Sequence, residues 1–235
     1  MNNAEILEKA KSWFRKSIAE NHISNTLKLS NPNEFNINPF LTLYLANFLT
    51  GNSSPKSIAK ALIYPRVLGT SITTSFGTQI QTFTSEVLGS FASTTSGIDI
   101  EFVDHIDGRK KYCQLKAGPN TINKDDVESI AGHFSKLRNL AKTNRLKIDS
   151  NDLIVGVIYG TSQDLNGHYH RLETEHHYDV ICGEQFWNRL TGDQTIYPSL
   201  IRAIAEVAIE SDFSKELDNV VELLSRAEVI QSIAQ

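Results

Sequence analysis

An uninterrupted apolar run at residues 153–159, LIVGVIY, is the feature that most constrains the fold of this chain. A strand that covers one face of a sheet alternates apolar and polar residues. A continuous apolar run of this length instead indicates a strand that is buried on both faces. Such a strand lies inside a sheet that has helices packed on both of its sides. The run therefore predicts a layered fold with the sheet in the middle.

Periodicity and turn residues predict the other elements. The polar stretches at 22–38 and 161–176 are expected to be surface loops. Strands are expected at 97–103, 112–116 and 178–182. Helices are expected at 3–21, 39–48, 57–63, 75–91, 124–142, 184–190, 197–210 and 214–233, the fifth of them capped by Asn123 or Thr121. This order predicts a mixed α/β sandwich with a central mixed sheet and extra helices at both ends.

Composition agrees with a soluble protein of one domain. The chain has 235 residues, of which 40% are hydrophobic and 21% charged, and it has no apolar run long enough to span a membrane. The N-terminal residues lack the features of a signal peptide, and Cys113 and Cys182 lie in apolar runs, as expected for buried thiols in a reducing cytoplasm. The net charge of −4 argues against a protein that coats nucleic acid but allows an enzyme with a local basic cleft.

Asp107-Gly108 predicts a tight hairpin between the first two strands. If these two residues form the turn, Asp99 lies opposite Lys116 and Glu101 lies opposite Gln114. Side chains alternate between the two faces of a strand, so these four polar groups share one face.

Two carboxylates, an amide oxygen and an ammonium would thus converge on one patch. Mg²⁺ prefers oxygen ligands and retains several waters, and a lysine beside a metal-bound water can orient it. The patch is therefore suited to hydrolysis of a phosphodiester. The simpler interpretation is a cross-strand ion pair on an exposed face of the sheet.

The segment that follows Lys116 strengthens the functional interpretation. Residues 117–123, AGPNTIN, form a small polar loop that leads into the helix at 124–142. Gly118 would allow the backbone to approach a ligand closely, and a helix N-terminus favours phosphate.

At these residues the sequence resembles the PD-(D/E)xK nuclease superfamily. The pattern in that superfamily is an Asp on one strand and an acidic residue, any residue and Lys on the next, and here Asp99 precedes Gln114-Leu115-Lys116. The sequence departs from the pattern at Gln114, although Gln-x-Lys variants occur in the superfamily. Glu101, the backbone carbonyl of Leu115 or Glu86 could complete the metal site.

A longer series of segments resembles a branch of type II restriction endonucleases that cut GG-N-CC palindromes. The series consists of 37–42 (INPFLT), 64–69 (YPRVLG), 115–118 (LKAG), 154–160 (IVGVIYG) and 186–187 (FW). The resemblance implies a cytoplasmic prokaryotic enzyme that cuts double-stranded DNA as a homodimer with Mg²⁺. No organic cofactor and no membrane association are expected. It also implies a single restriction-endonuclease-like domain, residues 1–235, with an N-terminal helical region (1–75), a catalytic core (76–183) and C-terminal helices (184–235).

Several polar residues are candidates for contact with DNA. Arg171 is the first choice for reading a base, because arginine recognises the O6 and N7 edge of guanine. The other candidates are Asn120, Thr121, Asn123, His168 and His170.

Three alternatives stay open. A repair or recombination nuclease of the same superfamily would also suit the Gln-x-Lys triplet. Gln114 equally suits a DNA-binding module whose metal site has decayed. The third alternative is a structural α/β domain without activity. Four polar groups gathered beside a polar loop make it less favoured.

Overall fold

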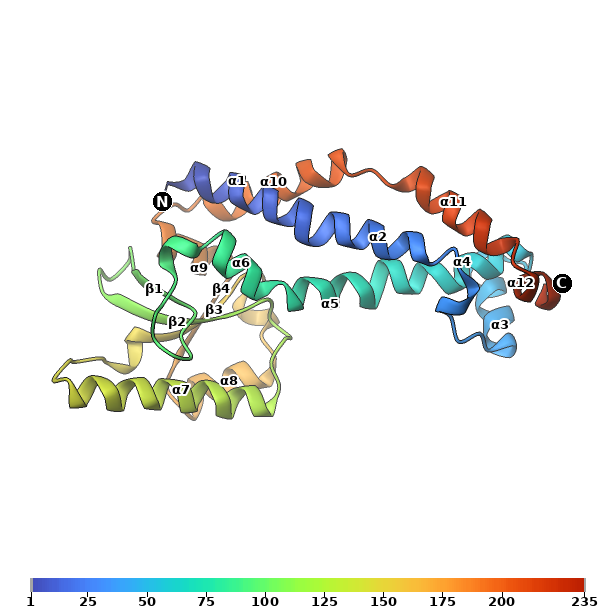
Figure 1. Ribbon diagram of the computed structural model, residues 1–235. Coiled ribbons are helices and arrows are strands. Elements are labelled where there is room, and N and C mark those ends of the chain that lie inside the picture. Colours follow the sequence, from blue (N-terminus) through green and yellow to red (C-terminus); the bar gives the residue numbers. More distant parts are fainter. Residues whose placement is uncertain (1, 235) are drawn as a thin grey trace. The chain divides into compact units, whose positions relative to one another are not determined.

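The computed structural model describes residues 2–234, which form two compact units. The first unit contains the residues up to Trp13 together with Gly77–Glu206, and the second contains Phe14–Phe76 and the residues from Val207 onward. The first unit holds the sheet (Figure 1). It also contains all the site residues predicted from the sequence. The mixed α/β fold with a central sheet and extra helices is confirmed. The predicted single domain stays a prediction.

The sheet has the strand order β1-β2-β3-β4. β1 is antiparallel to β2, whereas β2, β3 and β4 run parallel. The strands are β1 (Ile100–Val103), β2 (Lys110–Lys116), β3 (Leu153–Val157) and β4 (Asp179–Cys182). β3 lies inside the apolar run and is buried along its whole length, which confirms it as a central strand.

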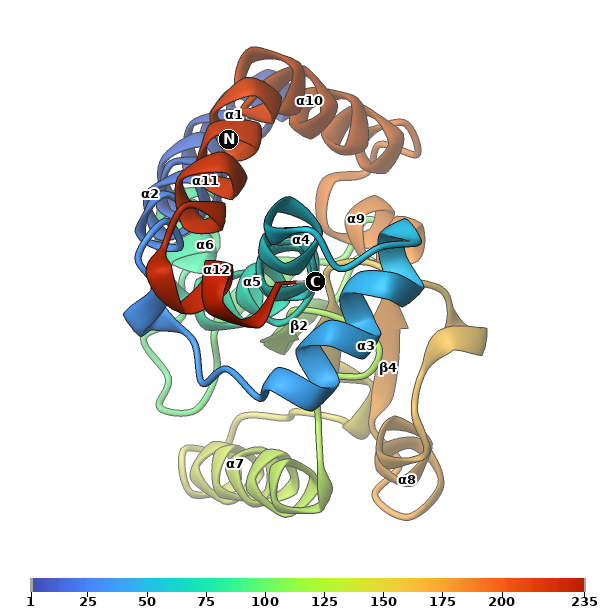
Figure 2. The ribbon, with the colours of Figure 1, turned by 90° about the vertical axis from the view of Figure 1, so that its right-hand side faces the viewer.

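The helices that connect the parallel strands cover one face of the sheet. The chain passes from β2 to β3 through α7 (Lys124–Thr143) and from β3 to β4 through α8 (Gly167–Thr174). Crossovers of one hand that step in one direction place their helices on the same face. Figure 2 shows α7 and α8 side by side, and α8 also contacts β4. Their buried residues join those of the sheet in one core.

The helix α9 (Gly183–Thr191) packs against β3 and β4. Its Phe186 and Trp187 are almost completely buried. A Cβ atom at Gly156, in the middle of β3, would lie only 2.6 Å from the ring of Phe186. The glycine that interrupts the branched residues of β3 therefore makes room for an aromatic ring.

The other helices lie before β1 and after α9. The first unit also contains α1 (Asn3–Trp13), α6 (Ile80–Glu86) and most of α10 (Ile196–Glu210). The second unit contains α2 (Asn21–Lys28), α3 (Pro39–Thr50), α4 (Pro55–Pro65), most of α5 (Ser71–Thr78), α11 (Ser214–Ser225) and α12 (Glu228–Ile233), and a π-helical segment, Phe14–Glu20, joins α1 to α2. None of the helices within residues 2–234 is long and apolar enough to cross a bilayer.

Three predictions of local structure are wrong. Part of the expected loop at 22–38 is helical, because α2 continues the N-terminal helix through the π-helical segment. The expected helix at 75–91 is divided into α5 and α6. The expected loop at 161–176 contains α8, which begins where the side chain of Asn166 accepts the N–H groups of His168 and Tyr169. The cap of α7 is Asn123, one of the two predicted residues.

The register of the β1–β2 hairpin also differs from the prediction. Ile100 pairs with Cys113 and Val103 with Lys110, a shift of two residues. The tight turn does not form, because the side chain of Asp104 accepts the N–H of Ile106 and its backbone N–H donates to the carbonyl of Arg109. The loop therefore begins earlier than Asp107. Because the shift is even, each side chain stays on its predicted face.

Candidate active site

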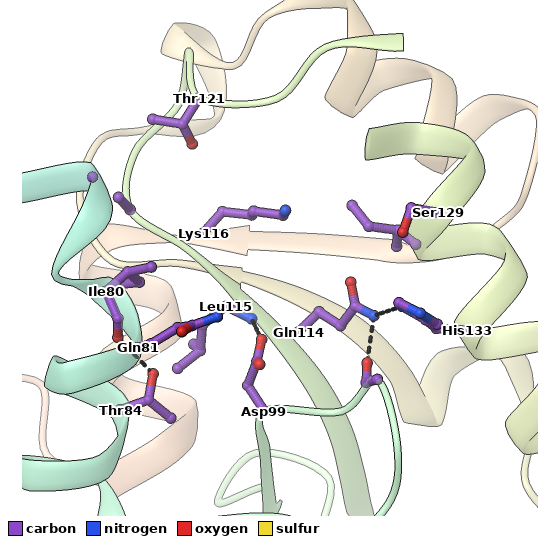
Figure 3. A pocket seen from close by; sticks show the side chains of 14 residues that line it. Ile80, Gln81, Thr84, Asp99, Gln114, Leu115, Lys116, Thr121, Ser129 and His133 are labelled. Carbon is purple, nitrogen blue, oxygen red and sulfur yellow. Dashed lines mark hydrogen bonds between the residues drawn. The ribbon is translucent and has the colours of Figure 1, made fainter. Parts of the chain in front are cut away.

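A pocket of about 450 Å³ lies in the first unit, where β1 begins and β2 ends (Figure 3). It is lined by residues from the end of α5, from α6, from the segment just before β1, from β2 and the loop after it, and from α7. These are Gly77, Ile80, Gln81, Thr84, Gly97, Asp99, Gln114, Leu115, Lys116, Ala117, Thr121, Ser129, Ile130 and His133. The pocket contains Asp99 and the whole Gln114-Leu115-Lys116 triplet, so the structure brings the predicted motif together.

Asp99 lies immediately before β1, and its N–H donates to the carbonyl of Cys113; extending the observed register by one residue places it opposite Gln114 rather than Lys116. Its Oδ2 accepts the backbone N–H of Leu115 at 2.7 Å, which fixes the carboxylate against the edge of β2. The side chain opens onto the pocket, but the surrounding protein replaces much of its water and raises its pKa. The Leu115 N–H, Lys116 and His133 oppose this rise.

Gln114 is buried, and its Nε2 atom has two hydrogen-bond partners. Nε2 donates to the carbonyl of Gly97 and lies 2.8 Å from Nδ1 of His133 on α7. The amide oxygen consequently faces the pocket (Figure 3). The orientation places an oxygen, and not an NH₂ group, where the family pattern has an acidic side chain.

His133 is a site residue that the sequence reasoning missed. It follows Ile130 by one helical turn, and Ile130 belongs to the apolar stripe that α7 buries. A polar residue at the edge of that stripe, on a helix that packs against the sheet, was the available signal.

Lys116 lies at the end of β2, and its Nζ pairs with Oδ1 of Asp126 at 3.2 Å. Asp126 stands in the first turn of α7, where its other oxygen accepts the N–H of Asn123 in a capping box. Burial raises the pKa of Asp126, but the Asn123 N–H and Lys116 outweigh it and lower the pKa. The helix cap therefore holds an acid that positions the lysine beside the pocket.

Glu101 belongs to a different polar group. It lies opposite Tyr112, forms an ion pair with Lys110 at 2.6 Å and accepts the hydroxyl of Thr95 at 3.0 Å. It is not among the residues that line the pocket. The predicted pairing of Glu101 with Gln114 is wrong because of the shifted register.

The loop after Lys116 is built differently from the expectation. Gly118 is buried, and a Cβ atom there would lie 2.4 Å from the hydroxyl of Tyr159, so a side chain fills the space expected for a ligand. The N-terminus of α7 is already occupied by the Asn123 capping box and carries Asp125 and Asp126. These contacts disfavour a phosphate at that position.

The predicted DNA-contact residues occupy two places. Thr121 lines the pocket, the neighbouring Asn120 is exposed, and the side chain of Asn123 caps α7. His168, His170 and Arg171 lie on α8. There the guanidinium of Arg171 pairs with Glu175, both contacts being 2.9 Å, and His170 lies 3.2 Å from Glu173.

The possible ligand atoms of the pocket are oxygens, and they fit Mg²⁺ better than a metal that prefers nitrogen or sulfur ligands. No group of three or more His, Cys, Asp or Glu side chains in residues 2–234 could hold a metal ion. The pocket instead offers the carboxylate of Asp99, the amide oxygen of Gln114 and the backbone carbonyl of Leu115. Mg²⁺ suits such a set, because it is commonly held by one or two carboxylates together with water and substrate phosphates.

Comparison with known proteins gives one assignment. A family model described as type II restriction endonuclease EcoO109I matches residues 23–212, which include every residue of the pocket. None of the curated proteins matches the chain.

Proposed function

The chain belongs to the family of type II restriction endonuclease EcoO109I, and we propose that it hydrolyses double-stranded DNA at a palindromic site in a Mg²⁺-dependent reaction. The observation that carries the proposal is the pocket in which Asp99, the oxygen of Gln114 and Lys116 converge. A palindrome of the GG-N-CC type is the proposed class of site.

Different residues are proposed to bind the metal, to position the attacking water and to contact the DNA. Asp99, held by the Leu115 N–H, would bind the ion together with Gln114 and the Leu115 carbonyl. A bound Mg²⁺ supplies positive charge that stabilises a phosphate under attack. Lys116 would position the attacking water and add its own charge beside the phosphate. Arg171, His168 and His170 on α8, with Asn120 and Thr121, are proposed to contact the DNA.

Replacing Lys116 by alanine is expected to lower the rate of cleavage by about a hundredfold, a typical cost of removing one charge-stabilising group. The measurement is digestion of a sequenced plasmid with Mg²⁺, followed by mapping of the ends. Lys110→Ala is the matched control, because Lys110 lies on the same strand but pairs with Glu101 outside the pocket. Equal loss in both variants would contradict the role of Lys116.

The same digest tests two other functions. A DNA-binding module without catalysis is favoured by Gln114, since Asp99 is the only acidic side chain among residues 2–234 that lines the pocket. It predicts retention of DNA in a gel with no cleavage by the unmodified chain. A repair or recombination nuclease predicts smearing or structure-dependent nicking, whereas discrete bands support restriction.

We propose further that two copies act together, because two-fold symmetry matches a palindromic site. The helix α3 in the second unit provides a surface for this contact. Its buried residues are the small Thr42 and Ala46, it packs against α4, and it has no charged residue. Leu43 packs partly buried against the core, whereas the other large apolar side chains of α3 are exposed, reaching 85% for Phe40 and 78% for Phe48; the rest are Leu41, Tyr44, Leu45 and Leu49. An uncharged apolar stripe is self-complementary, so it suits a second copy of itself.

Replacing Phe48 by glutamate is expected to convert a dimer into monomers, since a charge in the centre of an apolar contact has no partner. Sedimentation velocity or light scattering measures the change. Ile209→Glu is the control, because Ile209 is exposed to a similar extent, 79%, and lies on α10. A dimer that persists in Phe48→Glu, or a chain that is monomeric without any substitution, contradicts this contact.

A further inference from the structure

The side chain of Gln114 raises a problem that a carboxylate would not. The two ends of an amide have nearly the same shape but opposite chemistry, because the oxygen accepts and the NH₂ group donates. Only the oxygen end can bind a cation. A glutamine at the acidic position can therefore bind a metal only if its amide is held with the oxygen directed toward the ion.

Two neighbours hold the amide in this orientation. The carbonyl of Gly97 can only accept, and it receives one N–H of Gln114. Nδ1 of His133, 2.8 Å from Nε2, accepts the other when the ring carries its hydrogen on Nε2. Both hydrogens of the NH₂ group are thus used in contacts with the pocket wall, and the amide oxygen is the end that remains for a ligand.

Gly97 and His133 are also packed against each other. Gly97 has a φ of +78°, a backbone conformation that favours glycine. A Cβ atom at this position would lie 2.5 Å from Cγ of His133. The absence of a side chain at Gly97 lets the imidazole come close, so that the carbonyl and the ring together form one cradle for the amide.

We propose that His133 is a positioning residue that, with the carbonyl of Gly97, keeps the oxygen of Gln114 directed into the pocket. The identity of the ion rests on the proposed function, whereas the orientation of the amide does not. This arrangement lets a neutral side chain stand where the superfamily pattern has an acid. It also makes His133, on a helix distant in sequence from the motif, part of the metal site.

A pair of substitutions separates positioning from packing. Leucine and asparagine have similar shapes, but His133→Asn places a carbonyl oxygen near the position of Nδ1, whereas His133→Leu has no acceptor. The probe is Mn²⁺, a hard ion with similar oxygen ligands, titrated into the full chain without DNA and followed by paramagnetic broadening of pocket signals in NMR spectra. We expect His133→Leu to weaken Mn²⁺ binding about tenfold, as for loss of a group that orients a ligand, and His133→Asn to bind nearly as well as the unmodified chain.

A second measurement reads the amide itself. The side-chain NH₂ signals of Gln114 are identified by their absence in Gln114→Leu, and their exchange with solvent should be slow in the unmodified chain and in His133→Asn but fast in His133→Leu. Equal exchange in the two His133 variants overturns the inference, as does equal Mn²⁺ affinity. If the unmodified chain binds no Mn²⁺, the proposed function is contradicted, and the exchange rates alone decide the role of His133.

Discussion

Replacing Asp99 by asparagine is expected to lower the rate of DNA cleavage by about a thousandfold, the upper end of the cost of losing one charge-stabilising group. The loss exceeds that expected for Lys116→Ala because Asp99 is, within the described part of the chain, the one acidic side chain that lines the pocket. Asparagine has nearly the same shape and can still accept the N–H of Leu115, so the local backbone should be unchanged.

The same substitution is expected to stabilise the metal-free protein at neutral pH. The surrounding protein raises the pKa of Asp99 in the folded state, so the folded state binds its proton more tightly than the unfolded chain does. Between the unfolded pKa and the higher folded pKa, the folded state therefore carries more protons. The free energy of unfolding contributed by this group falls as pH rises through that window and stays lower above it.

Urea denaturation in the presence of a chelator, at a series of pH values, measures this effect. The free energy of unfolding of Asp99→Asn should increasingly exceed that of the unmodified chain as pH rises through the window. Glu101→Gln is the matched control, because burial raises the pKa of Glu101 but Lys110, Ser93 and Thr95 outweigh it and lower the pKa. That control should lose stability at neutral pH. A less stable Asp99→Asn protein would show that the carboxylate supports the fold.

The parts of the fold that follow from local patterns could be predicted. The apolar run of β3 needs only its own residues to indicate burial on both faces, and Asn123 caps α7 through bonds within its own turn. The motif residues of the pocket could also be placed together, because alternation along β2 puts Gln114 and Lys116 on the same face of the sheet. Asp99 lies on that face as well, because the observed register differs from the predicted one by an even number of residues.

The hairpin register could not be predicted, because contacts distant in sequence determine it. The side chain of Arg189 on α9 donates to Asp104, and its backbone carbonyl accepts the N–H of His105. These contacts hold the start of the loop in a conformation that the local Asp-Gly signal does not favour. The orientation of Gln114 was hidden for a similar reason, since His133 reaches it from another element.

The contact that determines the register should also contribute strongly to the stability of the fold. Replacing Arg189 by alanine is expected to lower the free energy of unfolding by about 3–5 kcal/mol, the cost of leaving a buried charge without its partner. Asp104 is completely buried, and its Oδ2 lies 2.6 Å from Nε of Arg189. Chemical denaturation monitored by circular dichroism measures the loss.

Arg226→Ala is the matched control, because Arg226 pairs with Glu222 on an exposed surface and such a pair contributes about 0–1 kcal/mol. Adding Asp104→Asn to Arg189→Ala should recover much of the loss, since asparagine carries no charge and can still accept the N–H of Ile106. If the double variant is no more stable than Arg189→Ala, the arginine acts through packing of its side chain and not by neutralising Asp104. The register of the hairpin would then depend on the shape of α9 rather than on this ion pair.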